Sequence, residues 1–297
     1  MEPVVRVEGL YKSFRSEFLG RRTEVLKDVS FAIAPGTVTG FLGGNGAGKT
    51  TTIKCLLGLI GADRGQITYF GQNELSREVK SRIGFLPERP YFYEYLTGEE
   101  FLRLYAQLSG RVPSDELQRR IDEVLDRVRL LHAKKRQLRG YSKGMLQRVG
   151  IAQAMIHRPE FIILDEPMTG LDPDGRKEVM DIIRETASLG TTVFFSSHLL
   201  HDAEAICDHL LILKEGKVVF TGELNQFLGH MDSTFTLRYR PSDPRSGGGQ
   251  EREMAIANED ELQQQIDRLR AEKSHIIDIH KKKVSLEEAF IKIALRG

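Results

Sequence analysis

The stretch "GGNGAGKT", residues 43–50, decides the fold. It matches the phosphate-binding pattern G-x-x-x-x-G-K-[ST] at every fixed position. The apolar run "TVTGFLG" leads into it and predicts a buried strand, and the segment that begins at Lys49 predicts a helix. Strand, glycine-rich loop and helix therefore follow one another in the order that a nucleoside triphosphate site requires.

The glycines of this loop allow successive backbone N–H groups to point inward at phosphate oxygens, and the helix N-terminus adds its positive dipole. We expect Lys49 to reach the β and γ phosphates and the Thr50 hydroxyl to bind Mg²⁺. The residues expected to contact the nucleotide here are Gly43, Gly44, Asn45, Gly46, Ala47, Gly48, Lys49, Thr50 and Thr51. Alone, this loop indicates only that a nucleoside triphosphate is bound.

A second stretch, "FIILDEP", supplies carboxylates. Its apolar residues predict a buried strand that ends at Asp165, an expected Mg²⁺ ligand, and Glu166 is the natural general base for an attacking water. The doublet points to hydrolysis, because metal binding alone does not need the adjacent glutamate. His198 follows "TVFFSS" at the end of another buried strand, where ligand sites gather in open α/β sheets. We expect it to contact the γ-phosphate or to hold Glu166 and the water in place, the alternative being an ordinary loop histidine.

The rest of the pattern predicts an α/β fold in two parts. Buried strands alternate with helices, which is typical of a parallel sheet. Short β-rich runs before Gly40 predict an antiparallel hairpin group, and residues 97–157 predict a helical subdomain. Beyond about Glu223 a strand, a loop, a helix, a second strand and a last helix predict a small α+β appendage. We therefore expect domains at 1–225 and 226–297.

Several helix ends are marked in the sequence. Thr97 with Glu100 predicts a capping box, as does Ser285 with Glu288. Asp172 is a predicted N-cap for a helix running from Pro173 to Leu189.

Composition restricts the partners. The 43 basic and 42 acidic residues nearly cancel, which gives no reason to expect nucleic acid or an anionic membrane as a ligand. No apolar run approaches the ~20 residues that a spanning helix needs, and the N-terminus has no secretory pattern. Cys55 and Cys207 show no metal-ligand or disulfide spacing, which fits a reducing compartment.

With these motifs in this order, residues 4–225 resemble the ATP-binding-cassette (ABC) ATPases, the nucleotide-binding subunits of ABC transporters. "GGNGAGKTT" is similar to the Walker A motif, "IILDE" to Walker B, "TGLD" to the D-loop and "SSH" to the switch histidine. The resemblance implies a P-loop cassette with a mostly parallel core sheet, an antiparallel β subdomain and a helical subdomain, which hydrolyses ATP with Mg²⁺. It assigns Phe14, in "YKSF", to stacking on adenine, the alternative being a strand residue that packs locally.

"YSKGM", residues 141–145, lies where the family has its signature, commonly Leu-Ser-Gly-Gly-Gln. In the family this segment closes on ATP held by a second subunit. Ser142 and Gly144 match the pattern and offer donors to a γ-phosphate at a helix start. Lys143 departs from it and either adds charge at that phosphate or points into water, the ordinary place for a lysine. Tyr141 and Met145 also depart, and methionine lacks the polar reach of glutamine.

"IGFLPERP" occupies the place of the Q-loop, where the family has glutamine and this chain has Glu88. We expect Glu88 to serve as a metal and coupling residue. Its extra negative charge is expected to raise the pKa of Glu166 by like-charge repulsion.

The resemblance extends to assembly. It implies two ABC subunits, with a homodimer preferred over a heterodimer, that sandwich two ATP molecules and communicate through Asp172. It further implies an exporter whose integral membrane permease is a separate chain. The permease would dock on the surface Arg89–Tyr95 beside the Q-loop, although the aromatics there can equally be core anchors. The expected location is cytoplasmic, peripheral on the inner face of the membrane, with the appendage accessory or dimerising.

Two other functions compete with this one. A soluble ABC-type ATPase acting on nucleic acid or cofactor assembly fits less well, because the chain has a single cassette without an inserted coiled coil. A non-hydrolysing regulatory subunit is disfavoured because Lys49, Asp165, Glu166 and His198 are all intact.

Overall fold

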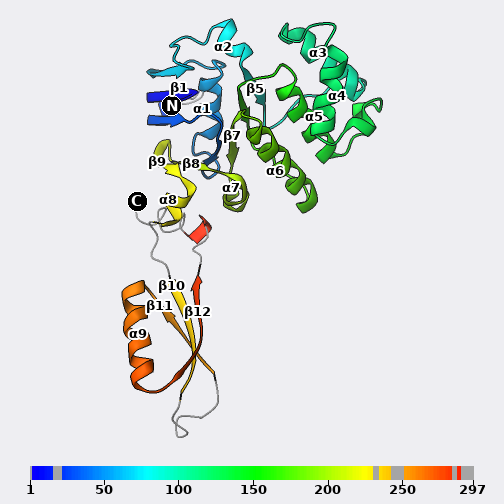
Figure 1. Ribbon diagram of the computed structural model, residues 1–297. Coiled ribbons are helices and arrows are strands. Elements are labelled where there is room, and N and C mark those ends of the chain that lie inside the picture. Colours follow the sequence, from blue (N-terminus) through cyan, green and yellow to red (C-terminus); the bar gives the residue numbers. More distant parts are fainter. Residues whose placement is uncertain (1, 16–21, 230–233, 242–250, 283–285, 289–297) are drawn as a thin grey trace. The chain divides into compact units, whose positions relative to one another are not determined.

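The computed structural model describes residues 2–15, 22–229, 234–241, 251–282 and 286–288. The chain divides into two compact units, Met1–Gly222 and Glu223–Gly297 (Figure 1). Within the described residues, no helix is both long enough and apolar enough to cross a bilayer.

A six-stranded sheet forms the centre of the first unit, and its neighbouring strands from β5 to β8 run parallel, as predicted. In spatial order the strands are β5 (Ile83–Leu86), β6 (Phe161–Leu164), β7 (Thr192–Ser197), β3 (Val38–Leu42), β8 (His209–Lys214) and β9 (Lys217–Glu223). Every residue of β3, β6 and β7 is buried, because these strands are covered on both faces. Their carboxyl ends lie at one edge of the sheet.

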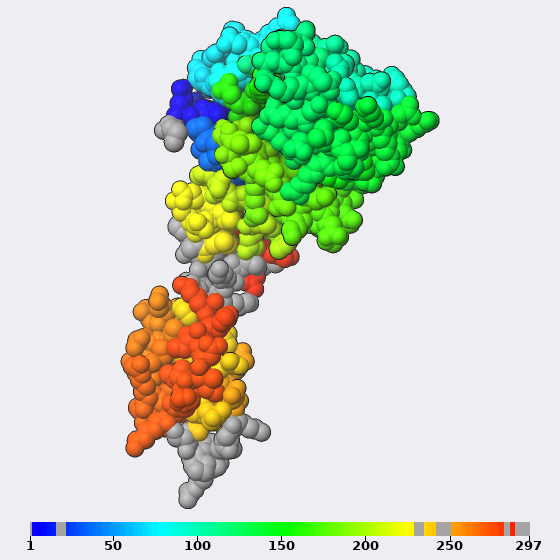
Figure 2. All heavy atoms as spheres, turned by 45° about the vertical axis from the view of Figure 1, so that its right-hand side comes forward, coloured from blue at the N-terminus to red at the C-terminus, as the bar shows by residue number. Residues whose placement is uncertain are grey.

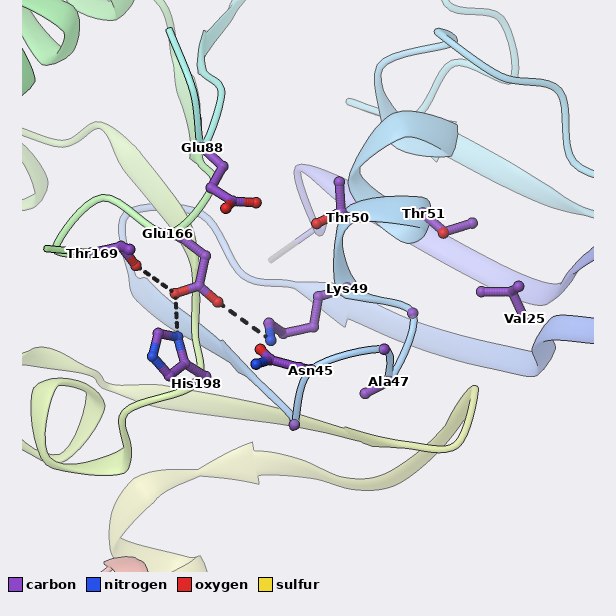
Figure 3. Close-up of a pocket in the computed structure, with 13 residues that line it drawn as sticks. Val25, Asn45, Ala47, Lys49, Thr50, Thr51, Glu88, Glu166, Thr169 and His198 are labelled. Atoms are coloured by element: carbon purple, nitrogen blue, oxygen red, sulfur yellow. Dashed lines mark hydrogen bonds and ion pairs between the residues drawn. The ribbon is translucent and has the colours of Figure 1, made fainter.

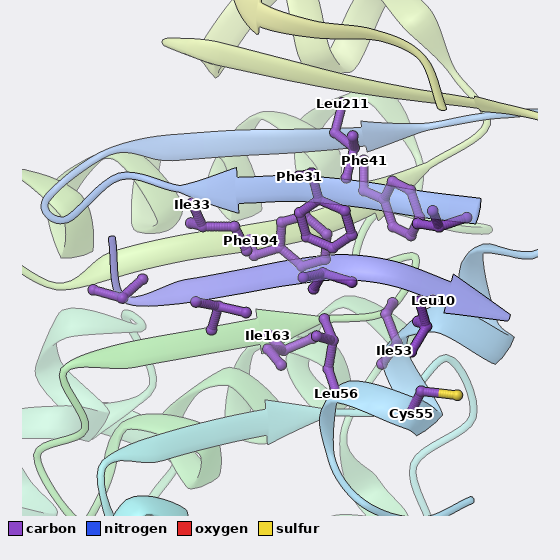
Figure 4. Close-up of a cluster of buried hydrophobic side chains, with 14 of the residues drawn as sticks. Leu10, Phe31, Ile33, Phe41, Ile53, Cys55, Leu56, Ile163, Phe194 and Leu211 are labelled. Carbon is purple, nitrogen blue, oxygen red and sulfur yellow. The ribbon is translucent and has the colours of Figure 1, made fainter. Parts of the chain in front are cut away.

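A three-stranded antiparallel sheet packs beside it and confirms the predicted hairpin group. Its order is β2 (Arg22–Ile33), β1 (Val5–Arg15) and β4 (Arg64–Tyr69). Between the two sheets lies an apolar core in which Phe194 stacks on Phe31 at 6.1 Å and on Phe41 at 5.2 Å between ring centroids (Figure 4). The core fixes the antiparallel sheet against the strand that leads into the glycine-rich loop.

Four helices of this unit connect the strands: α1 (Lys49–Leu56), α2 (Arg77–Ser81), α6 (Pro173–Ser188) and α7 (Leu200–Ile206). Asp172 caps α6 as predicted, since its side chain accepts a hydrogen bond from the Gly175 backbone N–H at 2.9 Å. The helix ends one residue before the predicted end at Leu189.

The helical subdomain contains α3 (Gly98–Ser109), α4 (Leu117–Arg127) and α5 (Lys143–Met155), with 3₁₀ turns at Leu131–Ala133 and Leu138–Gly140. In the space-filling view its atoms, coloured green, form one continuous lobe of the first unit (Figure 2). The capping box of Thr97 and Glu100 is confirmed. The lobe positions the N-terminus of α5, where the signature-like segment lies.

The second unit contains α8 (Leu224–Gly229) and an antiparallel sheet with β10 (Thr234–Arg240) between β11 (Arg252–Ile256) and β12 (His275–Lys282). Helix α9 (Glu259–Ala271) packs on the sheet over a small core of Phe235, Leu237, Ile256, Leu262 and Leu269. Strand β11 was not predicted, because its sequence "REMAI" is short and two of its five residues are charged. The predicted loop at 241–250, apart from Pro241, and the cap at Ser285 lie outside the described residues.

Candidate active site

The loop between β3 and α1 forms the floor of the site, and two properties require its glycines. Gly46 and Gly48 have φ angles of 78° and 111°, in the left-handed region that favours glycine. A Cβ on Gly48 would lie 2.8 Å from Leu26 Cδ2, and one on Gly43 would lie 2.5 Å from the Leu213 carbonyl oxygen. The loop therefore holds its shape only with these residues.

Lys49 is the first residue of α1, and its side chain folds back over the loop. The ammonium donates a hydrogen bond to the Gly43 carbonyl at 2.7 Å and lies 3.3 Å from Glu166 Oε1. Only 7% of the residue is exposed. The loop thus encloses a nearly buried cation at the place where the sequence expects phosphate.

Asp165 follows β6 and is buried, and its carboxylate accepts a hydrogen bond from the Ser196 hydroxyl at 2.6 Å. Burial raises the pKa of Asp165, and the neighbouring carboxylates of Glu166 and Glu88 raise it further. The Thr50 hydroxyl opposes the shift through a hydrogen bond. The negative charge of Glu88 therefore acts on Asp165.

Glu166 is the residue on which the other side chains converge (Figure 3). Its Oε2 lies 2.8 Å from His198 Nδ1 and accepts a hydrogen bond from the Thr169 hydroxyl at 3.2 Å. Its backbone adopts a left-handed φ of 50°, and its N–H donates to the Ser196 hydroxyl at 2.8 Å. A non-glycine residue held in this conformation is strained, and such strain clusters at functional sites.

Sequence reasoning missed two of these residues. Ser196 bridges the Asp165 side chain and the Glu166 backbone. The sequence feature that could have identified it is its position near the end of the buried run "TVFFSS". Thr169 belongs to the D-loop-like "TGLD" but carries no charge that would have singled it out.

A pocket of about 530 Å³ lies at this edge of the sheet. Its lining comprises Val25, Gly44, Asn45, Gly46, Ala47, Gly48, Lys49, Thr50, Thr51, Glu88, Glu166, Thr169 and His198. The structure thus brings together the phosphate-loop, general-base and histidine candidates. The other predicted site residues lie outside this lining: Phe14, Gly43, Ser142, Lys143, Gly144, Asp165 and Asp172.

The signature-like residues lie at the start of α5. Ser142 is exposed and caps the helix by accepting a hydrogen bond from the Met145 backbone N–H at 3.3 Å. Lys143 is also exposed, but its ammonium lies against Gly170, where an added Cβ would overlap Nζ. It shares the lining of a second pocket with Glu88 and Thr169. Its side chain therefore faces the D-loop segment of its own chain.

Phe14 lies on β1, is 44% exposed and has the Lys12 ammonium 5.4 Å from its ring centroid. Stacking of this partly exposed ring on adenine stays a prediction.

The residues fit Mg²⁺. Thr50, Asp165 and Glu88 supply oxygens, the ligands that Mg²⁺ prefers, and it commonly takes one or two carboxylates together with substrate phosphates. The crowding of carboxylates that raises the pKa of Asp165 is of the kind a cation relieves. Among the described residues there is no cluster of three or more His, Cys, Asp or Glu arranged to hold a metal without such phosphates.

Comparisons with known proteins agree with this geometry. The family model described as "ABC transporter" matches residues 26–169. An uncharacterized ABC transporter ATP-binding protein of Nostoc sp. is 47% identical over 233 residues, which cover 77% of this chain and 69% of the relative. Another of Synechocystis sp. is 41% identical over 299 residues, covering 97% of this chain and 84% of the relative.

Among solved structures, one described as the ATP-binding subunit of an ABC transporter superimposes with a TM-score of 0.66 at 34% identity. The match covers 75% of this chain and 91% of that structure. The α/β P-loop fold class expected from the sequence is confirmed.

Proposed function

Because the chain belongs to the family of ABC transporter ATP-binding proteins and is an ABC-type ATPase, we propose that it powers export through a separately encoded membrane permease. The observation that carries the catalytic part is the convergence of Lys49 and His198 on Glu166. This arrangement holds a carboxylate, oriented from two sides, against the phosphate loop.

The side chains have distinct roles in hydrolysis. The loop N–H groups and the Lys49 ammonium stabilise negative charge on the triphosphate. Glu166 accepts a proton from water as the water oxygen bonds to the γ-phosphorus and the bond to the bridging oxygen breaks. His198 holds Glu166 in a fixed orientation toward the γ-phosphate. Mg²⁺, held by Thr50, Asp165 and Glu88, would neutralise phosphate charge when bound.

The working unit in this proposal is a dimer that closes on ATP. Ser142 and Gly144 lie outside the pocket of their own chain, and the exposed Ser142 hydroxyl and the start of α5 present donors to solvent. They would complete the site of a second subunit, and we prefer a second copy of this chain to a different one. ATP then shifts the population toward the closed state, and hydrolysis reverses the shift. Asp172, the last residue of the D-loop segment and the N-cap of α6, would transmit the state across the dimer.

The permease would dock on the aromatic segment after Glu88. Tyr91 and Tyr95 are 80% and 67% exposed, so they are not core anchors, whereas Phe92 packs against Phe101 at 5.5 Å between ring centroids. Tyr93 contacts both exposed rings edge-on, at 5.8 and 6.1 Å between centroids. Exposed aromatics are enriched at protein interfaces. Docking here would place the chain in the cytoplasm on the inner face of the membrane.

We assign the ABC nucleotide-binding domain to residues 1–225 and an accessory or dimerising domain to 226–297. The second unit has its own apolar core of Phe235, Leu237, Ile256, Leu262 and Leu269, which supports its treatment as a separate domain.

Purification of the tagged full chain in mild detergent tests the proposal. We expect a multispanning membrane protein to co-purify and to stimulate ATP hydrolysis. Co-purification of nucleic acid without a membrane protein would favour the soluble ATPase instead. A dimer that binds ATP but never hydrolyses it would favour the regulatory subunit.

A further inference from the structure

Asp63, in the connection between α1 and β4, binds both strands of the hairpin that carries Phe14. Its Oδ2 accepts hydrogen bonds from the Ser13 backbone N–H at 2.9 Å and from the Ser13 hydroxyl at 2.5 Å. The same oxygen accepts from Arg22 Nη2 at 2.8 Å, and Lys12 Nζ lies 3.4 Å from Oδ1. One carboxylate thus links β1, β2 and the connection to β4.

This network lies next to Phe14 in β1 and next to the residue that pairs with Phe14 in β2. Ser13 directly precedes Phe14 in β1, and Arg22 directly precedes Thr23, the ladder partner of Phe14 in β2. Arg22 Nε also donates to the Ser13 hydroxyl at 2.5 Å. Loss of the Asp63 contacts would therefore allow the backbone of both strands to shift next to the aromatic ring.

The hairpin needs such support because its own ladder is irregular here. The β1–β2 register shifts between Leu10 and Lys12 and again between Lys12 and Ser13. Irregularities of this kind re-aim side chains and interrupt strand pairing. Since Ser13 donates its backbone N–H to Asp63, the direction in which β1 leaves the irregularity depends on this carboxylate.

The connection that contains Asp63 also positions the cation beside the ring. The Lys12 ammonium donates to the Gly61 carbonyl at 2.7 Å and lies 5.4 Å from the Phe14 ring centroid. The Asp63 backbone N–H donates to the Tyr11 carbonyl at 2.8 Å. Phe14 is 44% exposed and lies outside the apolar core between the sheets. Its position is therefore held by these polar contacts and not by apolar packing.

Hydrogen bonds from Ser13 and then Arg22 hold the pKa of Asp63 well below its usual range. The carboxylate therefore stays charged at any working pH, and its bonds do not switch.

We propose that Asp63 is a positioning residue for nucleobase recognition, which fixes the β1–β2 hairpin so that Phe14 presents its ring to adenine. This inference rests on the proposed adenine-stacking role of Phe14.

The test compares a ligand that has a base with one that has none. Binding of Mg²⁺-ATP and of Mg²⁺-tripolyphosphate is measured by calorimetry on the full chain, in a Glu166→Gln background that slows hydrolysis. The variants are Asp63→Ala, Asp63→Asn, Phe14→Ala and the double variant Phe14→Ala/Asp63→Ala. Glu8→Gln, an exposed carboxylate on the same strand, is the matched control. Urea unfolding of each variant reports stability separately.

We expect Phe14→Ala to weaken ATP binding roughly ten-fold, the scale of one base–aromatic stack, and Asp63→Ala to weaken it by about five-fold. Tripolyphosphate binding should stay within about two-fold throughout, because the phosphate loop is untouched. Asp63→Asn keeps an acceptor oxygen and should weaken ATP binding less than Asp63→Ala does. This variant carries the test if Asp63→Ala folds poorly. In the Phe14→Ala background, removal of Asp63 should cost almost nothing further, since coupled residues are not additive.

Equal losses for ATP and tripolyphosphate would overturn the proposal, as would full additivity in the double variant. Unchanged ATP binding in Phe14→Ala would overturn it by removing the stacking role. None of these outcomes bears on the proposed transport function, which stands or falls on ATP hydrolysis and on the membrane partner.

Discussion

The carboxylate oxygen Oε2 of Glu166 lies 2.8 Å from His198 Nδ1. The other oxygen of the same carboxylate lies 3.3 Å from the Lys49 ammonium. A triphosphate in the loop would compete for this ammonium, since phosphate oxygens are its expected partners. Glu166 would then exchange its cation for a water molecule while His198 still fixed its orientation.

The first prediction concerns Glu166→Gln. Glutamine keeps the size of the side chain but cannot accept a proton, so ATP binding should persist and hydrolysis should slow at least ~100-fold. Phosphate release and nucleotide binding, measured on the same preparation, check both parts. Glu74→Gln, at an exposed glutamate outside the pocket, is the control. Full turnover in Glu166→Gln would show that another group is the base.

The second prediction separates two neighbouring histidines. His198→Ala removes the contact that orients Glu166, and turnover should fall by about ten- to a hundred-fold with little change in ATP affinity. His201→Ala alters an exposed residue three positions away that does not line the pocket, and turnover should stay within about two-fold. Steady-state kinetics decide the matter, and equal effects at the two positions would contradict a specific role for His198.

The third prediction concerns Glu88→Gln, which restores the residue type common at this position in the family. Glutamine keeps an oxygen for Mg²⁺ but loses the negative charge, so the Mg²⁺ concentration for half-maximal turnover should rise several-fold. It also removes one of the carboxylates that raise the pKa of Asp165. A titration of activity against Mg²⁺ at saturating ATP measures the effect. Identical Mg²⁺ curves would show that the charge of Glu88 does not contribute to Mg²⁺ binding.

The sequence predicted the parts of the site that depend on local chain order. The phosphate loop, Asp165, Glu166 and His198 were identified because each follows a buried strand, and parallel strands bring their carboxyl ends to one edge. The bridging role of Ser196 depends on the pairing of β6 with β7, which no local pattern reveals.

Tertiary contacts limit what could be predicted elsewhere. The approach of Lys143 to Gly170 joins two segments whose spacing in the chain carries no signal. Strand β11 exists because Ile256 is buried in the core under α9, and its own residues would not have predicted a strand. The Asp63 network likewise depends on three strands meeting.

The fourth prediction addresses Lys143→Gly. Lys143 is exposed and its ammonium faces Gly170 of its own chain, so its loss should change ATP-driven dimerisation by no more than about two-fold. Ser142→Ala removes a hydroxyl expected to donate to phosphate and should weaken dimerisation about ten-fold. Size-exclusion chromatography with ATP in the Glu166→Gln background compares them. A large loss in Lys143→Gly would instead place this lysine at the nucleotide of the partner.

The fifth prediction concerns pH and His157, which follows α5 and donates its Nε2–H to the Ile83 carbonyl at 3.1 Å. Burial lowers the pKa of this histidine. Above the ordinary value of about 6.5 the ring is neutral in both states, and the full stability is present. As the pH falls below it, the unfolded chain binds a proton that the folded chain does not. The free energy of unfolding should then fall by at most about 1.4 kcal/mol per pH unit.

His157→Gln keeps a donor for the Ile83 carbonyl but cannot titrate, so the difference in stability between pH 7.5 and pH 5.5 should shrink. Urea unfolding at the two pH values measures it, and His132→Gln, at an exposed histidine, is the control. Equal pH dependence in the wild type and in His157→Gln would mean that the contact with Ile83 survives protonation, and that the junction between α5 and β5 does not sense pH.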